Sequence, residues 1–229
     1  MLFGLINNRG NLSFAEILFM LVSYAVVIFI MLPIHELAHA YAAHRLGDDT
    51  AKWNGRLRFN PLAHLDLYGT IMLLLFGVGY ARPVPVNPYN FRNHKRDMAL
   101  CALAGPASNL LMAVASVALF RAVCFFVTDM AVLGIFWMML VQIFAGVNIG
   151  LAAFNLLPVP PLDGFKIFGS VLPSRWVYTM ERYAQQISFI LMVLLFTGIL
   201  DIPLDFIRNI FCSVIGKLFG FHDLFNGYL

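Results

Sequence analysis

The chain has 229 residues, of which 61% are hydrophobic and only 12% are charged. A water-soluble domain draws roughly 25% of its residues from Asp, Glu, Lys and Arg to cover its surface, so this composition excludes an ordinary soluble protein. The formal net charge of +3 is too small for the basic surface of a nucleic-acid-binding protein, and we expect no nucleic-acid partner. The sequence therefore predicts an integral membrane protein surrounded by the lipid bilayer.

Four apolar segments are long enough to cross the hydrocarbon core of a bilayer, which takes about 20 helical residues. They are residues 12–33, 99–127, 131–157 and 183–200. The first is too long for a signal peptide, and little positive charge precedes it. We therefore expect an all-α, polytopic membrane protein with about four transmembrane helices, built as a single domain over residues 1–229.

Two further apolar segments are too short or too polar to span. Residues 67–80 are interrupted by glycines and followed by a proline-rich stretch, which predicts a re-entrant segment that enters the membrane and returns. Residues 206–221 place apolar side chains on one helical face and polar side chains on the other. That pattern predicts a C-terminal helix lying in the membrane interface.

Positive charges predict the topology, because cytoplasmic connections carry an excess of Lys and Arg. Of the 15 Lys and Arg residues, eight lie within residues 45–98 and three more within residues 158–182. We expect these two segments on the cytoplasmic side and the N-terminus outside. The protein would then be a multi-pass protein of the cell or inner membrane.

The most informative motif is P-I-H-E-L-A-H-A, residues 33–40, at the end of the first predicted span. His35 and His39 are four residues apart, so they share one helix face and can bind one ion, with Glu36 beside them. This is the H-E-x-x-H arrangement of zinc peptidases, with two histidine ligands and a glutamate general base. A charged residue inside a membrane helix costs about 2.5–3.5 kcal/mol on insertion scales, which favours a functional role.

A catalytic zinc ion generally takes three protein ligands, so a third is expected elsewhere. The strongest candidate is Asp163, in N-L-L-P-V-P-P-L-D-G, residues 155–164. The prolines forbid a continuing helix, so the chain should unwind there, on the side of the membrane where His35 and His39 lie. Other candidates remain open, namely Asp48, Asp49, His64, Asp66, His94 and Asp97, although we interpret His64 and Asp66 as structural.

These motifs resemble those of the site-2 protease family of intramembrane zinc metalloproteases. The sequence A-G-P-A-S-N, residues 104–109, is similar to that family's GPxxN segment. The chain is similar to the minimal branch of the family, without the PDZ or CBS domains of other members. We interpret Pro106 and Asn109 as helix-packing residues rather than catalytic ones.

The resemblance implies that His35, His39 and Asp163 bind one Zn²⁺ per chain and that Glu36 is the general base. It also implies that Asn155 binds the backbone of the substrate. The expected activity is hydrolysis of peptide bonds within or near transmembrane segments of membrane-protein substrates, as in regulated intramembrane proteolysis.

A helical substrate must unfold locally to be cut. Residues 77–86 could present an edge to which the unfolded segment adds as a strand, or they could only close the site from lipid. Two other functions would use the same side chains. A metal-binding or transport protein leaves Glu36 without a role, and a catalytically inactive membrane scaffold needs neither intact motif. The oligomeric state does not follow from the sequence.

Overall fold

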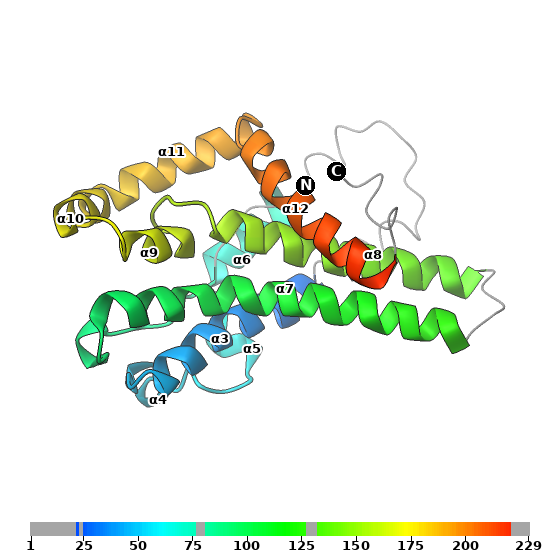
Figure 1. Cartoon of the computed structure of the whole chain (residues 1–229), viewed down its shortest axis with the longest axis horizontal. Helices are drawn as coiled ribbons and strands as arrows, with labels where there is room; N and C mark the ends of the chain where they lie inside the picture. The colour runs from blue at the N-terminus through cyan, green and yellow to red at the C-terminus, as the bar shows by residue number, and fades with distance from the viewer. Residues whose placement is uncertain (1–21, 23–24, 77–80, 127–131, 221–229) are drawn as a thin grey trace.

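The computed structural model describes residues 22, 25–76, 81–126 and 132–220, and the regular elements in this part of the chain are all helices (Figure 1). A short π-helix, η1 (Val27–Met31), runs directly into α3 (Leu32–Arg45). Pro33 explains the widened turn, because it lacks an N–H and its ring clashes with the carbonyl four residues earlier. The HExxH motif therefore lies within α3, which continues to Arg45.

The connection between α3 and the next long helix consists of short elements. They are α4 (Thr50–Trp53), α5 (Pro61–His64), α6 (Leu67–Phe76) and the 3₁₀-helix η2 (Pro88–Asn90). The described residues contain no β-strand, although Leu65 and Ala81 form an isolated bridge. Helix α6 covers 10 residues of the predicted re-entrant segment, which is too few to span, and residues 77–80 lie outside the described part.

Helix α7 (His94–Phe126) is the central element of the fold, and it continues through Pro106 over 33 residues. It packs against α3, α8 (Val132–Asn155) and α9 (Asp163–Gly169) (Figure 1). Ala113 on α7 and Ala145 on α8 are fully buried between these helices. Small residues at such positions let two helix backbones approach closely in a membrane.

The C-terminal third forms α10 (Ser174–Arg182), α11 (Ala184–Phe196) and α12 (Asp201–Phe219). Helices α11 and α12 are bent against each other by 80°. The turn between them contains Gly198, whose φ of +75° is a conformation that L side chains disfavour. Cys212 and Ile215 of α12 join the core formed with α7 and α8, whereas Val214 is exposed.

The expected all-helical class is confirmed, but the count of four spans is not. Within the described part, α7 alone is long and apolar enough to cross a membrane by itself, and α11 with α12 qualifies as one broken span. Most of the predicted span 12–33 lies outside the described residues. The predicted span 183–200 corresponds to α11, which ends after 13 residues. The predicted C-terminal helix is present as α12, which begins at Asp201 and packs against α7 and α8.

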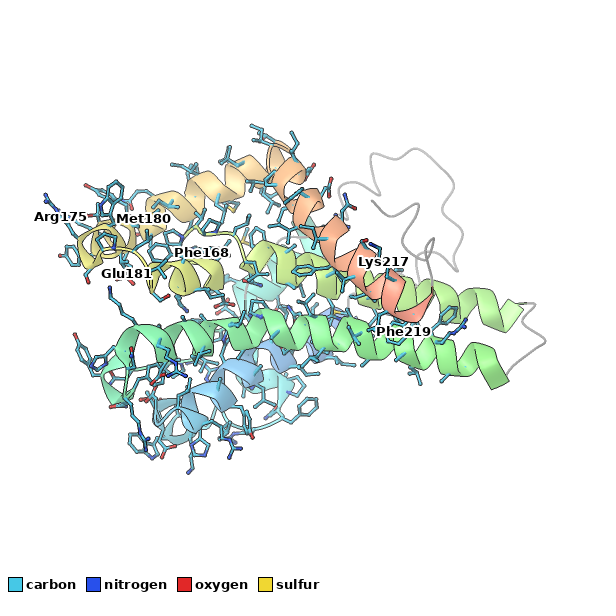
Figure 2. The ribbon with its side chains drawn as sticks, viewed as in Figure 1. Phe168, Arg175, Met180, Glu181, Lys217 and Phe219 are labelled. Carbon is cyan, nitrogen blue, oxygen red and sulfur yellow. The ribbon has the colours of Figure 1, made fainter. Side chains whose placement is uncertain are left out.

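Parts of the two connections rich in Lys and Arg lie at the same end of the molecule. Figure 1 shows α4, the start of α7 and α10 gathered at that end. Figure 2 shows Arg175, Met180 and Glu181 of α10 there, while Lys217 and Phe219 of α12 lie farther along the molecule. The parts of the basic segments 45–98 and 158–182 that form α4, the start of α7 and α10 therefore lie at one end of the fold.

Candidate metal centre

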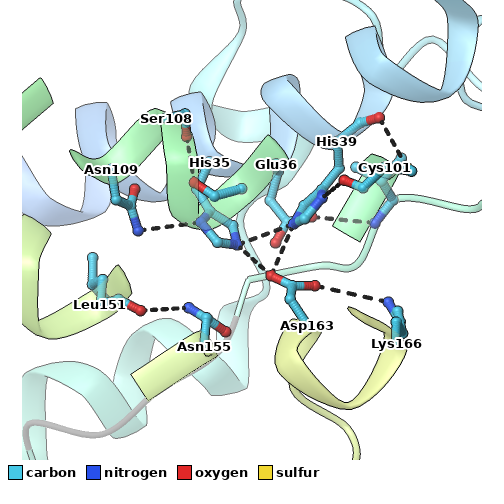
Figure 3. Close-up of polar contacts among 12 residues, drawn as sticks. His35, Glu36, His39, Cys101, Ser108, Asn109, Leu151, Asn155, Asp163 and Lys166 are labelled. Carbon is cyan, nitrogen blue, oxygen red and sulfur yellow. Dashed lines mark hydrogen bonds and ion pairs between the residues drawn. The ribbon is translucent and has the colours of Figure 1, made fainter. Parts of the chain in front are cut away.

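Three side chains from two distant parts of the chain meet at one point. His35 and His39 project from one face of α3, and Asp163 is the first residue of α9. The two histidine Nε2 atoms are 3.2 Å apart, and Asp163 Oδ2 lies 3.1 Å from His39 Nε2 and 3.3 Å from His35 Nε2 (Figure 3). All three residues are buried, and among the described residues they form a group that could hold a metal ion.

The separations of these donor atoms fit zinc. Zinc bonds of about 2.0–2.1 Å in a tetrahedron place neighbouring donor atoms roughly 3.3–3.4 Å apart. The three distances between His35 Nε2, His39 Nε2 and Asp163 Oδ2 are 3.1–3.3 Å, close to these values. Two imidazoles and one carboxylate are also the donor types of a three-ligand zinc site with an open fourth position.

The proton on His39 supports the same conclusion. His39 Nδ1 lies 2.8 Å from the backbone carbonyl oxygen of Cys101, which can only accept a hydrogen bond. Nδ1 therefore carries a proton, and in the neutral imidazole Nε2 offers a lone pair toward Asp163 and His35. Lone pairs directed at one point repel each other unless a cation lies between them, so this arrangement suits a bound metal ion.

The turn after α8 delivers Asp163 to the histidines. Helix α8 ends at Asn155, and Pro158, Pro160 and Pro161 prevent it from continuing. The chain then folds back so tightly that a β-carbon at Gly164 would lie 2.3 Å from the Leu156 carbonyl oxygen. Glycine is thus required after Asp163 for the turn to close, which is the structural reason for the L-D-G sequence.

Glu36 faces the same cavity but is held by a different part of the chain. Its Oε2 accepts a hydrogen bond of 3.2 Å from the backbone N–H of Val84. The segment around Val84 is fixed at both ends, because Arg82 N–H donates to the His64 carbonyl oxygen and Asn87 N–H donates to Asp48 Oδ2. The carboxylate of Glu36 is therefore positioned beside the three converging side chains by a loop 48 residues away.

These residues line a cavity of about 600 Å³ between α3, α7, α8, α9 and α11. Its walls are mainly apolar and include Val84, Val86, Phe154 and Leu195. Asn155 also lines the cavity, but its Nδ2 donates to the Leu151 carbonyl oxygen at 3.0 Å. The structure thus places Asn155 at the site without a described hydrogen bond to His35, His39 or Asp163.

The other residues considered as a third metal ligand have different partners. Asp48 accepts from Thr50, Asn87 and Asn90, and Asp49 pairs with His44. The remaining contacts join Asp66 to the Gly69 N–H, Asp97 to the Asn93 N–H, His64 to the Arg58 carbonyl oxygen and His94 to the Pro88 carbonyl oxygen. His64 and Asp66 therefore stabilise the connection between α3 and α7, as the sequence suggested.

The contribution of α7 to the site does not follow from the motifs alone. The sequence favours Asn109 as a packing residue, yet its side-chain amide lies 3.2 Å from His35 Nδ1. Cys101, Gly105 and Asn109 recur every four residues and line the face of α7 that meets the two histidines. His35 and His39 have the same spacing on α3, but equal spacing on two helices does not show that they meet, so this contact follows only from the packing of α3 against α7.

Comparison with known proteins agrees with this geometry. A sequence model described as peptidase family M50 matches residues 122–197. Three relatives are named as putative zinc metalloproteases. YwhC of Bacillus subtilis is 42% identical over 180 residues, which cover 77% of this chain and 81% of YwhC. Rip2 of Mycolicibacterium smegmatis is 33% identical over 71% of this chain and 61% of Rip2. MJ0611 of Methanocaldococcus jannaschii is 30% identical over 58% of this chain and 62% of MJ0611. No solved structure matches the chain. At 42% identity over most of both chains, this protein belongs to peptidase family M50, the membrane-embedded metalloproteases of the site-2 protease type.

Proposed function

We propose that this chain is an intramembrane zinc endopeptidase that hydrolyses peptide bonds within or near transmembrane segments of membrane-protein substrates. The observation that carries the proposal is the convergence of His35 Nε2, His39 Nε2 and Asp163 Oδ2, with Glu36 lining the same cavity. His35, His39 and Asp163 would hold one zinc ion per chain. A bound zinc ion would polarise the scissile carbonyl. It would also lower the pKa of a water molecule, so that this water can act as the nucleophile near neutral pH.

Glu36 has the position of a general base in this reaction. It follows His35 directly on α3, so its carboxylate opens into the cavity beside the metal ligands. The Val84 N–H occupies one of its oxygens and leaves the other to take a proton from the attacking water. The same carboxylate can then give that proton to the leaving amine.

The cavity suits an extended, apolar peptide. A helical substrate hides its carbonyls in its own hydrogen bonds, so it has to unwind before it can be cut. Mainly apolar walls would accept the side chains of an unwound transmembrane segment, and Asn155 is the nearby amide that could hydrogen-bond its backbone. Most backbone N–H groups of residues 82–87 already donate hydrogen bonds inside the molecule. A substrate strand that added beside these residues would therefore pair chiefly with their carbonyl oxygens.

The distribution of charge supports a multi-pass protein whose N-terminus is outside and whose active site lies toward the cytoplasm. Helix α4, the start of α7 and α10, which belong to the basic segments 45–98 and 158–182, lie at one end of the fold. Arg45 ends the helix that carries His35 and His39. From His39 to Arg45 is only about 9 Å of helix, so water from that side has a short path to the site.

The zinc site is tested by metal analysis of detergent-purified protein. The wild type is expected to contain about one zinc per chain, and His39→Ala and Asp163→Ala are expected to lose it. Zinc retained in Asp163→Ala would move the third ligand elsewhere. Wild-type protein without zinc, after purification without chelators and after addition of zinc, would contradict the proposal.

Peptidase activity is tested separately with Glu36→Gln. This variant is expected to bind zinc like the wild type but to lose cleavage by at least about 100-fold, the usual contribution of a general base. Mass spectrometry of new peptide termini in membranes from cells expressing either form measures the loss even while the substrate is unidentified. Identical termini in both would favour a scaffold, whereas zinc flux into vesicles carrying the purified protein would favour transport.

A further inference from the structure

Asn109 is a buried amide with an unsatisfied oxygen beside a proposed metal ligand. It lies on α7, and its side chain is completely buried. Its Nδ2 is 3.2 Å from His35 Nδ1, and its Oδ1 has no hydrogen-bond partner among the described residues. A buried amide oxygen without a partner costs about 1–3 kcal/mol, so an arrangement that satisfies it is favoured.

Proton counting identifies that arrangement. If His35 Nε2 offers its lone pair to a metal, as the convergence with His39 and Asp163 requires, then Nδ1 of the neutral ring carries the proton. Nδ1 is then a donor and needs an acceptor, but an amide nitrogen cannot accept. Rotating the Asn109 amide by 180° leaves its shape almost unchanged and exchanges its oxygen and nitrogen. Oδ1 then accepts from His35 Nδ1–H, and the amide NH₂ takes the position that has no partner among the described residues. The need of His35 Nδ1–H for an acceptor therefore decides the orientation.

His39 provides the precedent within the same site. Its Nδ1 faces the Cys101 carbonyl oxygen, which fixes the tautomer that points a lone pair from Nε2 into the centre. Asn109 lies two helical turns farther along the same face of α7, opposite His35. The side-chain oxygen of Asn109 would thus accept a hydrogen bond from Nδ1 of His35, as the carbonyl oxygen of Cys101 does from Nδ1 of His39.

We propose that Asn109 is a positioning residue of the metal centre, whose Oδ1 accepts the Nδ1–H of His35 and so fixes the tautomer and orientation in which His35 binds zinc. The inference rests on the proposed zinc site. Hydrogen-bond partners of this kind orient the metal ligand and raise its basicity, and removing one typically weakens metal binding 10–100-fold.

Three variants test the inference by zinc affinity, measured by chelator competition in detergent. Asn109→Leu keeps the size of the side chain but removes the acceptor, and it is expected to bind zinc 10–100-fold more weakly than the wild type. Asn109→Asp keeps an acceptor and is expected to bind at least as tightly as the wild type. Asn109→Ala removes the acceptor without the bulk of leucine, and it serves if Asn109→Leu does not fold.

Asn148 offers a matched control. It is also fully buried, and its Oδ1 has no hydrogen-bond partner within the part of the chain that the structure describes. Its Nδ2, however, donates to the Phe144 carbonyl oxygen on α8, and Asn148 does not line the cavity. Asn148→Leu is expected to keep wild-type zinc affinity, while its thermal stability without zinc changes about as much as that of Asn109→Leu. This comparison separates a role toward the metal from a role in packing.

The outcomes distinguish this inference from the proposed function. Wild-type zinc affinity in Asn109→Leu and Asn109→Ala, with zinc lost in His39→Ala, would overturn the role of Asn109 and leave the zinc site standing. Equal weakening in Asn109→Asp and Asn109→Leu would also overturn it, since the acceptor would then be irrelevant. Wild-type protein that binds no zinc would overturn the proposed function and the inference together.

Discussion

Gly105 on α7 stands directly against His39. A β-carbon at position 105 would lie 2.3 Å from His39 Nε2 and 2.6 Å from His35 Cε1. Contacts this short do not occur for real side chains, so the glycine leaves the space in which the two imidazoles meet Asp163. The distance between α3 and α7 is therefore set at the candidate metal centre itself.

Replacing Gly105 with alanine is expected to displace His39 and abolish zinc binding. The added methyl group cannot be accommodated, because the His39 imidazole that it meets is buried and hydrogen-bonded to the Cys101 carbonyl oxygen. Zinc content per chain measures the effect. Gly146→Ala is the control, since a β-carbon there meets nothing within 4 Å, and it should keep full zinc content. Normal zinc in Gly105→Ala would show that α7 stands farther from α3 than described.

Lys166 is expected to matter little for the metal, although it lies near a proposed ligand. Its Nζ is 3.9 Å from Asp163 Oδ1, the oxygen that faces away from the histidines, and its side chain is 43% exposed. Exposed ion pairs contribute only about 0–1 kcal/mol. Lys166→Met should therefore change zinc affinity less than about fivefold, measured beside Asp163→Ala, which should lose zinc. A loss in Lys166→Met as large as in Asp163→Ala would make the lysine part of the metal centre.

Alanine at Gly164 is expected to destabilise the fold. Its β-carbon would meet the backbone carbonyl oxygens of Leu156 and Leu157 at 2.3 and 2.4 Å, and backbone atoms cannot move aside as a flexible side chain can. Overpacking of this kind costs typically about 1–3 kcal/mol. Thermal unfolding in detergent compares it with Gly169→Ala, where the nearest contact is an ordinary 3.6 Å. Equal melting temperatures for the two variants would contradict the described turn.

Asp48 is expected to make stability depend on pH. It lies in the connection between α3 and α7, outside the predicted spans. Burial alone raises the pKa of its carboxyl, but hydrogen bonds from Thr50, Asn90 and Asn87 favour the ionised form and bring the pKa below its ordinary value of 3.8. The unfolded chain therefore binds this proton more readily than the folded one. The stabilisation is complete above about pH 4 and disappears as pH falls through the lower, folded-state pKa.

Asp48→Asn should accordingly lower the melting temperature at pH 7, by an amount that corresponds to about 1.5–3 kcal/mol for hydrogen bonds to a charged group. The difference from wild type should remain at pH 5 and shrink below pH 4. Asp49→Asn is the control, because its carboxylate is 36% exposed and pairs with His44 on the surface. A difference for Asp48→Asn that stays constant down to pH 3 would mean that the carboxylate is not the stabilising species.

The convergence of His35, His39 and Asp163 was largely predictable, because zinc-binding chemistry requires particular residues at particular spacings. His35, Glu36 and His39 lie within one helical turn, and the prolines before Asp163 indicate the break that returns the chain. The structure brings Asp163 to the two histidines and leaves the other candidate ligands elsewhere. Asn109 escaped prediction because a single amide in an apolar helix has the same appearance whether it packs or orients a neighbour. Only the opposing helix gives it a role.

The spans were less predictable because apolar length does not determine where a helix bends. Residues 183–200 and 206–221 look like one spanning and one interfacial helix, yet the turn at Gly198 makes α11 and α12 a single bent unit. Burial of Cys212 and Ile215 against α7 and α8 then places α12 against the helix bundle. That packing depends on residues far away in the sequence, and the local pattern does not contain it.

Residues 82–87, whose Val84 N–H donates to Glu36, contain two prolines that limit contacts between molecules. Pro83 and Pro85 have no N–H, and of the four N–H groups within residues 82–87, those of Arg82, Val84 and Asn87 already donate inside the molecule. Two copies of such a segment would pair poorly with each other, because most of the groups that face each other would be acceptors. An unwound peptide substrate of the proposed reaction would bring its own unused N–H donors. The protein can thus keep an extended segment beside the candidate metal centre while that segment offers few N–H donors for pairing with a neighbouring copy.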